Sequence, residues 1–495
     1  MTDVLAAPAP HRADRAESAM SAPYLWIGGV RVETADAFDV RSPYDGALAG
    51  RAGQATAEHV CAALDGAAGR SAPPPEERAA ILDRAADHYA THAESAARLI
   101  TAEAGICLKQ ARHEVHRAVN ALRGAAHEAR RLAAADWEAP YRVPGESPAA
   151  ELHVIPEPVT LAIAITPFNH PLNQVAHKVA PAIAAGAPVV LKPSEKTPLS
   201  ALRLAEVLAE CGLPPHLLNV VTGRPAEPIV RALVCDPRAE LVSFTGSVAV
   251  GKAIARTMAE GGNELVRYLP ELGGNAALVV LADADVERAA RIALGAFDNA
   301  GQRCTAINRI LVQEPVADAF TARLAELASA LSYGDPWDER TDVGPVIDEA
   351  SAIRIERAID AALGDGARLL VGGSRAGAVV APTVIDHVRP EMEIVRRETF
   401  GPVAPIVRIR SVDDAIRIVR ADNHRLSGAI ATRSEDAARA YAAAIRVGQF
   451  SWNGPPGYRT ETAPFGGFGD SGNGEKEGIV HATRAHLHLR TFYRH

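Results

Sequence analysis

The sequence has few cysteines and no long hydrophobic run. Its five cysteines are widely spaced and none forms a Cys-x-x-Cys pair, which fits a reducing compartment with free thiols. No stretch reaches the roughly 18 consecutive apolar residues that a membrane-spanning helix needs. Residues 1–20 carry mixed charges and lack the apolar core of a signal peptide. We therefore expect a cytoplasmic protein with no membrane partner and no bound metal, preceded by a disordered tail over residues 1–20.

An excess of basic residues is also absent. The chain carries 52 Lys and Arg against 60 Asp and Glu, a net charge of −8, whereas nucleic-acid binders usually carry a basic excess. Hydrophobic residues make up 48% and charged residues 23% of the 495 residues, as in ordinary globular proteins. We expect a folded chain of several domains with no nucleic-acid partner. A local cluster of cations in such an acidic chain would therefore be significant.

Short apolar runs alternate with amphipathic stretches from about residue 160 onward. Runs at 160–165, 188–192 and 241–245 have the pattern of buried strands, and helical patterns separate them. This alternation predicts βαβ units and a parallel sheet covered on both faces, with ligands at the carboxyl ends of its strands. A second alternation from about residue 271 predicts a second α/β domain. Helices are expected over 76–134.

One helix in that region combines an apolar stripe with a cation. Val115, Val119, Leu122 and Ala126 recur at steps of three and four residues, and Arg117 falls off this stripe. Arg117 is therefore expected to point away from the core of its own helix.

Cys304 is the sharpest local feature of the sequence. It follows Arg303 in a short polar turn, and a neighbouring cation favours the thiolate, which is the nucleophilic form. A cysteine in a reducing compartment is more often a buried small hydrophobe. The remaining four cysteines lie among apolar residues of predicted helices and are expected to be structural; they are Cys61, Cys107, Cys211 and Cys235.

Two further polar residues stand beside glycines or prolines at the ends of predicted strands. Glu271 precedes two glycines and is a candidate general base, although a solvent-exposed glutamate in a turn has the same pattern. Asn169, in the loop after the first strand, could supply an amide donor to a reacting carbonyl oxygen. Asparagine between prolines is also common in ordinary turns.

These segments belong to a series of motifs that resembles the NAD(P)-dependent aldehyde dehydrogenase superfamily over about residues 25–490. In order, the motifs are TPFNHP, LKPSEKTP, SFTGS, PELGGN, GQRCT, ETFGP and PFGGFGDSG. The resemblance implies an α/β aldehyde dehydrogenase-like fold, with a Rossmann-like cofactor domain, a second α/β catalytic domain and a small β excursion for oligomerisation. The implied divisions are a cofactor domain over 21–135 and 159–270, a catalytic domain over 271–480, and oligomerisation segments at 136–158 and 481–495.

The resemblance also implies roles for individual residues. Cys304 would attack the aldehyde carbon, Asn169 and the Cys304 N–H would bind the oxyanion, and Glu271 would activate water to hydrolyse a thioester. A carboxylate at Glu195 would accept from the adenosine ribose hydroxyls and favour NAD over NADP. The residues implied in cofactor binding are Thr166, Pro167, Lys192, Ser194, Glu195, Phe244, Gly246, Ser247, Leu272, Glu398 and Phe400.

A narrower resemblance, to phosphonoacetaldehyde dehydrogenases, concerns the substrate. It is carried by EAGICLK at 103–109, RHEVHR at 112–117, residues 166–181 and PGYR at 456–459. Arginine presents a planar fork of donors that suits phosphonate oxygens, although Arg303 could instead pair with a carboxylate and Arg117 could be a solvated helix residue. The expected substrate-binding residues are Arg117, His170, Arg303, Thr305 and Arg459.

The sequence therefore predicts NAD-dependent oxidation of a small anionic aldehyde to its acid, with phosphonoacetaldehyde to phosphonoacetate as the leading reaction. The alternatives are another anionic aldehyde, such as sulfoacetaldehyde, glyceraldehyde 3-phosphate or a semialdehyde, and a non-catalytic structural use of the fold. A CoA-acylating or phosphorylating relative would not need Glu271 as a base for water. A homodimer or homotetramer is expected from the resemblance.

Overall fold

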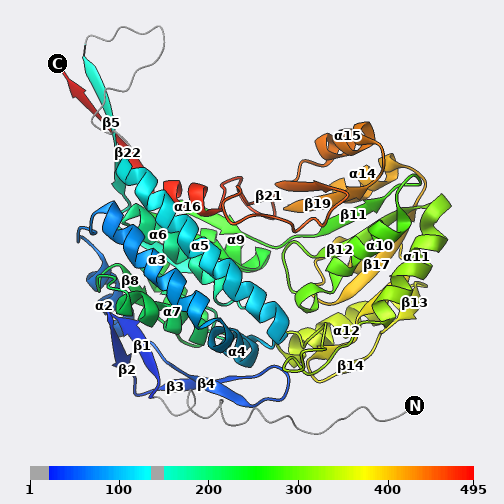
Figure 1. Cartoon of the computed structure of the whole chain (residues 1–495), viewed down its shortest axis with the longest axis horizontal. Coiled ribbons are helices and arrows are strands. Elements are labelled where there is room, and N and C mark those ends of the chain that lie inside the picture. Colours follow the sequence, from blue (N-terminus) through cyan, green and yellow to red (C-terminus); the bar gives the residue numbers. More distant parts are fainter. Residues whose placement is uncertain (1–21, 135–149) are drawn as a thin grey trace.

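Two seven-stranded sheets organise the molecule, each in its own lobe, and a two-stranded ribbon projects from the first lobe (Figure 1). The structure is a computed structural model that describes residues 22–134 and 150–495. Over these residues, no helix combines the length and the apolar composition needed to cross a membrane.

The first sheet has the strand order β10-β9-β6-β7-β8-β1-β2. Strands β6 to β10 pair in parallel, whereas β1 is antiparallel to both β8 and β2. Parallel strands end at one edge of a sheet, so the loops after β6, β7 and β9 open side by side. The strands are β1 (Tyr24–Ile27), β2 (Val30–Glu33), β6 (Ala162–Ile165), β7 (Val189–Lys192), β8 (Leu218–Val220), β9 (Leu241–Thr245) and β10 (Arg267–Glu271).

Helices cover both faces of this sheet, as the continuous apolar strands predict. Along β6, Ile163 packs into one core cluster while Ala162 and Ala164 pack into the other, because successive side chains of a strand point to opposite faces. One face is covered by α2 (Ala57–Ala67), α8 (Ala226–Val234) and α9 (Val248–Glu260). The other is covered by α3 (Pro75–Thr91), α4 (Ala93–Ala104), α5 (Leu108–Ala134), α6 (Asn173–Ala185) and α7 (Leu199–Glu210).

Two buried glutamates fix the starts of α6 and α7. Glu114 on α5 accepts hydrogen bonds from the main-chain N–H groups of Leu172 and Asn173, at 2.9 and 3.0 Å. Glu103 on α4 does the same for the first N–H groups of α7. These carboxylates satisfy helix-end donors that would otherwise be buried without partners. They thereby hold the loops that precede both helices.

The second sheet has the order β13-β16-β17-β12-β11-β19-β20 and is parallel except for the β13–β16 pair. Its strands are β11 (Ala276–Val280), β12 (Ile307–Gln313), β13 (Arg368–Val371), β16 (Thr383–Asp386), β17 (Val403–Ile409), β19 (Ser427–Ala431) and β20 (Gln449–Trp452). Its helices are α10 (Val286–Ala293), α11 (Glu314–Ser329), α12 (Glu349–Gly364), α13 (Glu393–Arg396), α14 (Val412–Arg420) and α15 (Glu435–Ile445).

The remaining elements are short or peripheral. Helix α16 (Ile479–Ala485) packs against α5 and α6, so the end of the predicted catalytic segment and the start of the predicted oligomerisation segment at 481–495 lie against the first lobe. Three small sheets complete the description: β3 (Ala37–Arg41) with β4 (Leu48–Gly53), β14 (Arg375–Ala376) with β15 (Val379–Val380), and β18 (His424–Arg425) with β21 (Phe468–Gly469).

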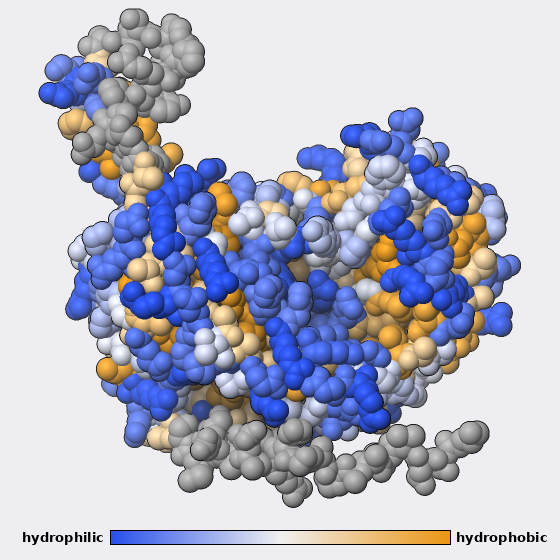
Figure 2. All heavy atoms as spheres, viewed as in Figure 1, coloured by the Kyte–Doolittle hydropathy of each residue, from blue (hydrophilic) through white to orange (hydrophobic). Residues whose placement is uncertain are grey.

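The projecting ribbon consists of β5 (Glu151–Pro158) paired antiparallel with β22 (Leu487–Arg494). Leu489, Phe492 and Tyr493 on β22 are more than half exposed, and hydrophobic residues are visible on the projecting arm in Figure 2. The predicted tail at 1–20 and residues 136–149 of the predicted excursion lie outside the described residues. The division into domains stays a prediction, although β10 ends at Glu271, where the predicted domain boundary lies.

Candidate active site

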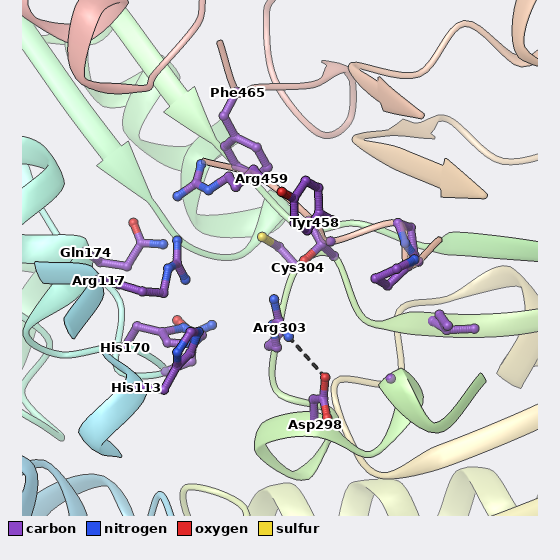
Figure 3. Close-up of a pocket in the computed structure, with 17 residues that line it drawn as sticks. His113, Arg117, His170, Gln174, Asp298, Arg303, Cys304, Tyr458, Arg459 and Phe465 are labelled. Atoms are coloured by element: carbon purple, nitrogen blue, oxygen red, sulfur yellow. Dashed lines mark hydrogen bonds and ion pairs between the residues drawn. The ribbon is translucent and has the colours of Figure 1, made fainter. Parts of the chain in front are cut away.

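Cys304 opens into a cavity of about 310 Å³ at the junction of the two lobes (Figure 3). The cavity receives side chains from α5, from the loop after β6, from the turn before β12 and from the loop after β20. The lining residues are His113, Arg117, Asn169, His170, Gln174, Gly295, Asp298, Arg303, Cys304, Thr305, Ile307, Pro455, Pro456, Gly457, Tyr458, Arg459 and Phe465. All five predicted substrate-binding residues are among them.

The backbone leading to Cys304 is strained. Asn299 and Ala300 both have positive φ angles, 51° and 52°. Residues other than glycine rarely adopt such backbone angles. Gly301 follows at φ 72°, and a Cβ atom there would lie 2.0 Å from the main-chain oxygen of Gly401. Only glycine fits at this position. Close contact with the main chain of Gly401 therefore fixes the path of the turn before Cys304.

Asn169 is held against this turn by two hydrogen bonds. Its side-chain Nδ2 donates to the main-chain oxygen of Gln302 at 2.8 Å. In return, Nδ2 of Asn299 donates to the main-chain oxygen of Asn169 at 2.9 Å. The structure therefore brings Asn169 and Cys304 to one cavity and fixes the amide beside the thiol.

The expectation that Arg303 makes Cys304 a thiolate is wrong for this state of the protein. Burial and the carboxylate of Glu398 together raise the pKa of the Cys304 thiol to about 12. The positive charges of Arg459 and Arg303 act in the opposite direction but are outweighed. The free-energy cost of removing a thiolate from water exceeds the stabilisation that the two nearby guanidinium groups provide. The thiol therefore predominates at neutral pH.

Glu271 lies at the end of β10 and is buried, not solvent-exposed. Burial and the neighbouring carboxylate of Glu477 raise the pKa of Glu271 well above its usual range. Its Oε2 atom has no hydrogen-bond partner among the described residues. It does not line the Cys304 cavity, but it lies close enough for its charge to raise the pKa of the thiol. Lys178 pairs with Glu477 and donates to Ser243 at 2.8 Å.

The cations of the cavity differ in their partners. Arg117 forms an ion pair with Glu461 at 2.7 Å, and Arg303 lies 3.3 Å from Asp298. Arg303 lines the cavity and also lies near a carboxylate, so its role as a substrate ligand and the alternative of pairing with a carboxylate both stay predictions. Arg459 stacks on the ring of Phe465 at 3.9 Å.

The two histidines of the cavity add little positive charge. Burial and nearby arginines lower the pKa of both His113 and His170. His170, expected among the possible cations, is therefore neutral at physiological pH.

A second cavity, of about 410 Å³, meets the first at Cys304. Its walls include the N-terminus of α9 and Glu398, which accepts a hydrogen bond from the Gly274 N–H at 3.0 Å. Burial raises the pKa of Glu398 to about 7. Six predicted cofactor residues line this cavity: Pro167, Gly246, Ser247, Leu272, Glu398 and Phe400.

The other predicted cofactor residues lie around or beneath these walls. Glu195 lines a third cavity, of about 520 Å³, together with Lys196 and Arg224. Lys192 is buried and donates to the Pro193 oxygen at 2.8 Å and to Glu195 at 3.4 Å. Ser194 caps its own turn, Thr166 is buried, and the ring of Phe244 packs under Gly246. Lys192, Ser194, Thr166 and Phe244 therefore lie behind the cavity walls and line none of the three cavities.

Sequence reasoning missed several residues of these cavities. Gln174 lies one helical turn after His170 on α6, and Phe168 packs edge-on against Phe400 at 6.0 Å. Arg354 on α12 lines the second cavity and donates to the Thr399 oxygen at 2.8 Å. Spacing from His170 could have identified Gln174. No motif near Arg354 in the sequence indicates that this residue lines a cavity.

Two further expectations concern the remaining cysteines and a bound metal ion. Cys61, expected to lie among apolar residues, is exposed on α2, whereas Cys107 is buried. Among the residues that the structure describes, no group of three or more His, Cys, Asp or Glu side chains is arranged to hold a metal ion.

Comparison with known proteins assigns the chain to a family. Residues 30–492 match the model of the aldehyde dehydrogenase family. The 3-sulfolactaldehyde dehydrogenase of Priestia aryabhattai is 37% identical over 92% of this chain and 95% of its own length. The succinate-semialdehyde dehydrogenase of Escherichia coli (strain K12) is 35% identical over 92% of this chain and 94% of its own length.

Solved structures give the same result. The NAD-dependent aldehyde dehydrogenase from Sinorhizobium meliloti superposes with a TM-score of 0.91 at 33% identity, covering 99% of this chain and 97% of that one. The NADP-dependent glyceraldehyde-3-phosphate dehydrogenase from Bacillus halodurans C-125 gives a TM-score of 0.89 at 33% identity, covering 96% and 99%. The chain therefore has the aldehyde dehydrogenase fold, belongs to the aldehyde dehydrogenase family and is an NAD(P)-dependent enzyme that oxidises aldehydes to acids.

Proposed function

We propose that this enzyme oxidises a small anionic aldehyde with NAD, and that its substrate is phosphonoacetaldehyde, which becomes phosphonoacetate. The observation that carries the proposal is that Cys304 opens into the same cavity as three arginines from three different segments. A cavity of about 310 Å³ lies at the small end of the range for ligand pockets, which favours a small substrate. A charged group on that substrate would meet guanidinium donors in the cavity wall.

In this proposal Cys304 attacks the carbonyl carbon. The forming oxyanion accepts hydrogen bonds from the Asn169 amide and the main-chain N–H of Cys304, a type of contact worth about 100- to 1000-fold in rate. The thiol loses its proton to solvent water in the cavity as attack proceeds, since the thiolate is the nucleophile. Covalent capture divides one difficult oxidation into two easier steps.

The second cavity has the features of a nicotinamide-dinucleotide site. Thr245 Oγ1, in the wall of this cavity, is buried without a hydrogen-bond partner among the described residues, and the N-terminus of α9 opens beside Ser247. Such a helix end attracts phosphate. Ser247 would hold the pyrophosphate, and Glu398 and Phe400 would position the nicotinamide riboside. NAD bound there would supply the hydride acceptor for the oxidation.

Glu271 is proposed to activate the water that releases the acid from the Cys304 thioester. Its raised pKa suits a base that must take a proton near neutral pH. Because it stands back from the Cys304 cavity in this structure, its carboxylate must reach the thioester carbon through the water or by a rotation of its side chain.

NAD is favoured over NADP by Glu195. Its carboxylate lines the third cavity, where it would repel a 2′-phosphate. The lysine Lys192 lowers the pKa of Glu195 against the opposing effect of burial, so the repelling charge persists at neutral pH. Relatives use either cofactor, since the solved structures include an NAD-dependent and an NADP-dependent enzyme.

Other anionic aldehydes remain the competing substrates: sulfoacetaldehyde, glyceraldehyde 3-phosphate or a semialdehyde. A panel of aldehydes tests the proposal, with NADH formation followed by absorbance. We expect phosphonoacetaldehyde to give the highest kcat/KM and an uncharged aldehyde such as propanal the lowest. A higher kcat/KM for propanal would remove the anion site from the proposal, and a higher value for another anion would name the substrate instead.

We also propose a homodimer or homotetramer built on the β5–β22 ribbon. An isolated two-stranded ribbon has little stability in water, and its exposed Leu489, Phe492 and Tyr493 offer apolar area for a second copy. Light scattering of the protein with and without residues 487–495 tests this. An unchanged mass after truncation would contradict it.

A further inference from the structure

The three arginines of the Cys304 cavity are not equivalent. Arg117 on α5 donates from Nε and Nη2 to the two carboxylate oxygens of Glu461, at 2.7 and 3.1 Å. The side chains are 16% and 10% exposed, respectively, so the pair is largely desolvated. Such a two-point contact is the strong form of an arginine–carboxylate pair. The charge of Arg117 is therefore cancelled before any substrate enters.

Glu461 is held as a carboxylate by its surroundings. It lies on the loop after β20, two residues beyond Arg459, and also accepts a hydrogen bond from Nε2 of His177 on α6 at 2.5 Å. Burial opposes its charge, but hydrogen bonds from His177 and Arg117 hold the pKa of Glu461 well below its usual range. Burial lowers the pKa of His177, so this imidazole donates a hydrogen bond without adding a charge.

The other two arginines have no comparable counter-ion. Arg459 belongs to none of the ion pairs among the described residues, although the charges of Glu461 and Glu477 act on it from nearby, and its Nη1 atom is buried without a hydrogen-bond partner. Arg303 has Asp298 at 3.3 Å, but the Asp298 side chain is 54% exposed, so water screens that contact. Of the three guanidinium charges, one is cancelled and two are left facing the cavity.

We infer that Glu461 is a specificity-determining residue: by cancelling Arg117 it leaves about two positive charges, which selects a doubly charged phosphonate or phosphate group over a singly charged sulfonate or carboxylate. The inference rests on the proposed function and narrows it to one class of anion. A buried charge is costly unless a group of opposite sign matches it. A dianion would balance Arg459 and Arg303, whereas a monoanion would leave one of them uncompensated.

The test compares two substrates of similar size and different charge. Phosphonoacetaldehyde is assayed above the second ionisation of its phosphonate, and sulfoacetaldehyde serves as the monoanion. The measured quantity is the ratio of their kcat/KM values in each variant. The kcat/KM for propanal is measured alongside and shows any effect that a substitution has on all aldehydes. The variants are Glu461→Gln, Arg117→Gln and the double variant carrying both changes.

We expect Arg117→Gln to lower the dianion-to-monoanion ratio about tenfold, because it leaves Glu461 uncompensated and reduces the net charge by one. Glu461→Gln should raise the ratio, because it removes the negative charge and keeps the shape of the side chain. The double variant removes both charges, so its ratio should return to within about threefold of the original, a difference of less than about 1 kcal/mol.

Two results would overturn the inference. In one, Glu461→Gln leaves the ratio unchanged. In the other, the double variant is as poor as Arg117→Gln, which would mean that Arg117 binds the substrate directly. If Arg117→Gln does not fold, the dianion-to-monoanion ratios of Glu461→Gln and of the double variant still test the inference. Failure of the proposed function would look different: the unaltered enzyme would show no preference for phosphonoacetaldehyde, whatever the variants do to the ratio.

Discussion

The side-chain amide of Asn169 donates a 2.8 Å hydrogen bond to the main-chain oxygen of Gln302, two residues before Cys304. A carboxamide has two N–H groups, so this bond fixes the plane of the amide and leaves the second N–H for the cavity. Asn169 is 8% exposed, and little water competes for that second donor. Its orientation is therefore set before the substrate arrives, as stabilisation of a developing oxyanion requires.

Replacing Asn169 with Ala should lower kcat by about 100- to 1000-fold, the usual cost of losing one oxyanion donor. The effect should appear in the first, NADH-forming turnover, measured by stopped flow. The affinity for NAD, measured by quenching of protein fluorescence, should change little. A loss of less than about threefold in the first turnover would mean that the amide does not contact the oxyanion.

Alkylation of Cys304 by iodoacetamide should become faster with pH without levelling off near pH 8 to 9. The pKa of its thiol is raised to about 12, so the thiolate fraction increases about tenfold for each pH unit below that value. The rate is measured for the Cys304 peptide by mass spectrometry in the absence of cofactor. The peptide with exposed Cys61 provides an internal comparison that should react faster at neutral pH.

A plateau in the Cys304 rate near neutral pH would show that the arginines do generate a thiolate in the free enzyme. Turnover itself is tested separately. Cys304→Ala should abolish aldehyde oxidation, and substantial residual activity would refute its assignment as the nucleophile.

Most of the fold could be predicted from the sequence. The continuous apolar runs at 160–165 and 241–245 became β6 and β9 within two residues, because strands buried on both faces need apolar side chains throughout. It also identified the loops that meet at the site, since the carboxyl ends of parallel strands share one edge. Asn169 and Cys304 therefore came together as expected.

What could not be predicted depends on contacts between distant segments. Arg117 pairs with Glu461, 344 positions away, and no local pattern indicates that its charge is cancelled. The thiol of Cys304 is controlled by burial, which its polar sequence neighbours conceal. Both features depend on desolvation and on partners in space, which set the charge of a group in a folded protein.

Glu271→Gln should slow the release of product more than the formation of NADH. A stopped-flow trace should then show a rapid burst of NADH followed by a slow steady state, since the thioester forms but is not hydrolysed. In the unaltered enzyme the burial of Glu271 and the charge of Glu477 raise its pKa. The base is therefore ionised only at a higher pH than an ordinary glutamate, and the hydrolysis rate should rise with pH as Glu271 loses its proton.

The variant provides its own control for that pH dependence. Glutamine cannot ionise, so the slow phase of Glu271→Gln should lose the rise attributed to the carboxyl group. NADH formation that is uniformly slow, with no burst, would place Glu271 in the oxidation step instead.

Glu195→Gln should shift the cofactor preference toward NADP. The substitution removes the carboxylate that would oppose a 2′-phosphate and leaves Lys192 and Arg224 nearby, the latter donating to the Glu195 main-chain oxygen at 2.9 Å. We expect the NADP-to-NAD ratio of kcat/KM to rise about tenfold, or about 1.4 kcal/mol. Glu435→Gln, on the surface of α15, should leave the ratio unchanged. If both variants behave alike, Glu195 does not face the ribose.

Arg459→Gln should weaken catalysis on a charged substrate while sparing the fold. Arg459 belongs to no ion pair of the described residues, and its buried Nη1 atom has no hydrogen-bond partner there, so a substrate anion would gain about 1.5–3 kcal/mol from each hydrogen bond with it. We expect kcat/KM for phosphonoacetaldehyde to fall about 100-fold and that for propanal less than about threefold. Because removing an uncompensated buried charge relieves a desolvation cost, Tm should stay the same or rise. Arg439→Gln, an exposed arginine on α15, is the matched control. Equal losses on both aldehydes together with a lower Tm would show that Arg459 supports the loop structurally and does not bind the anion.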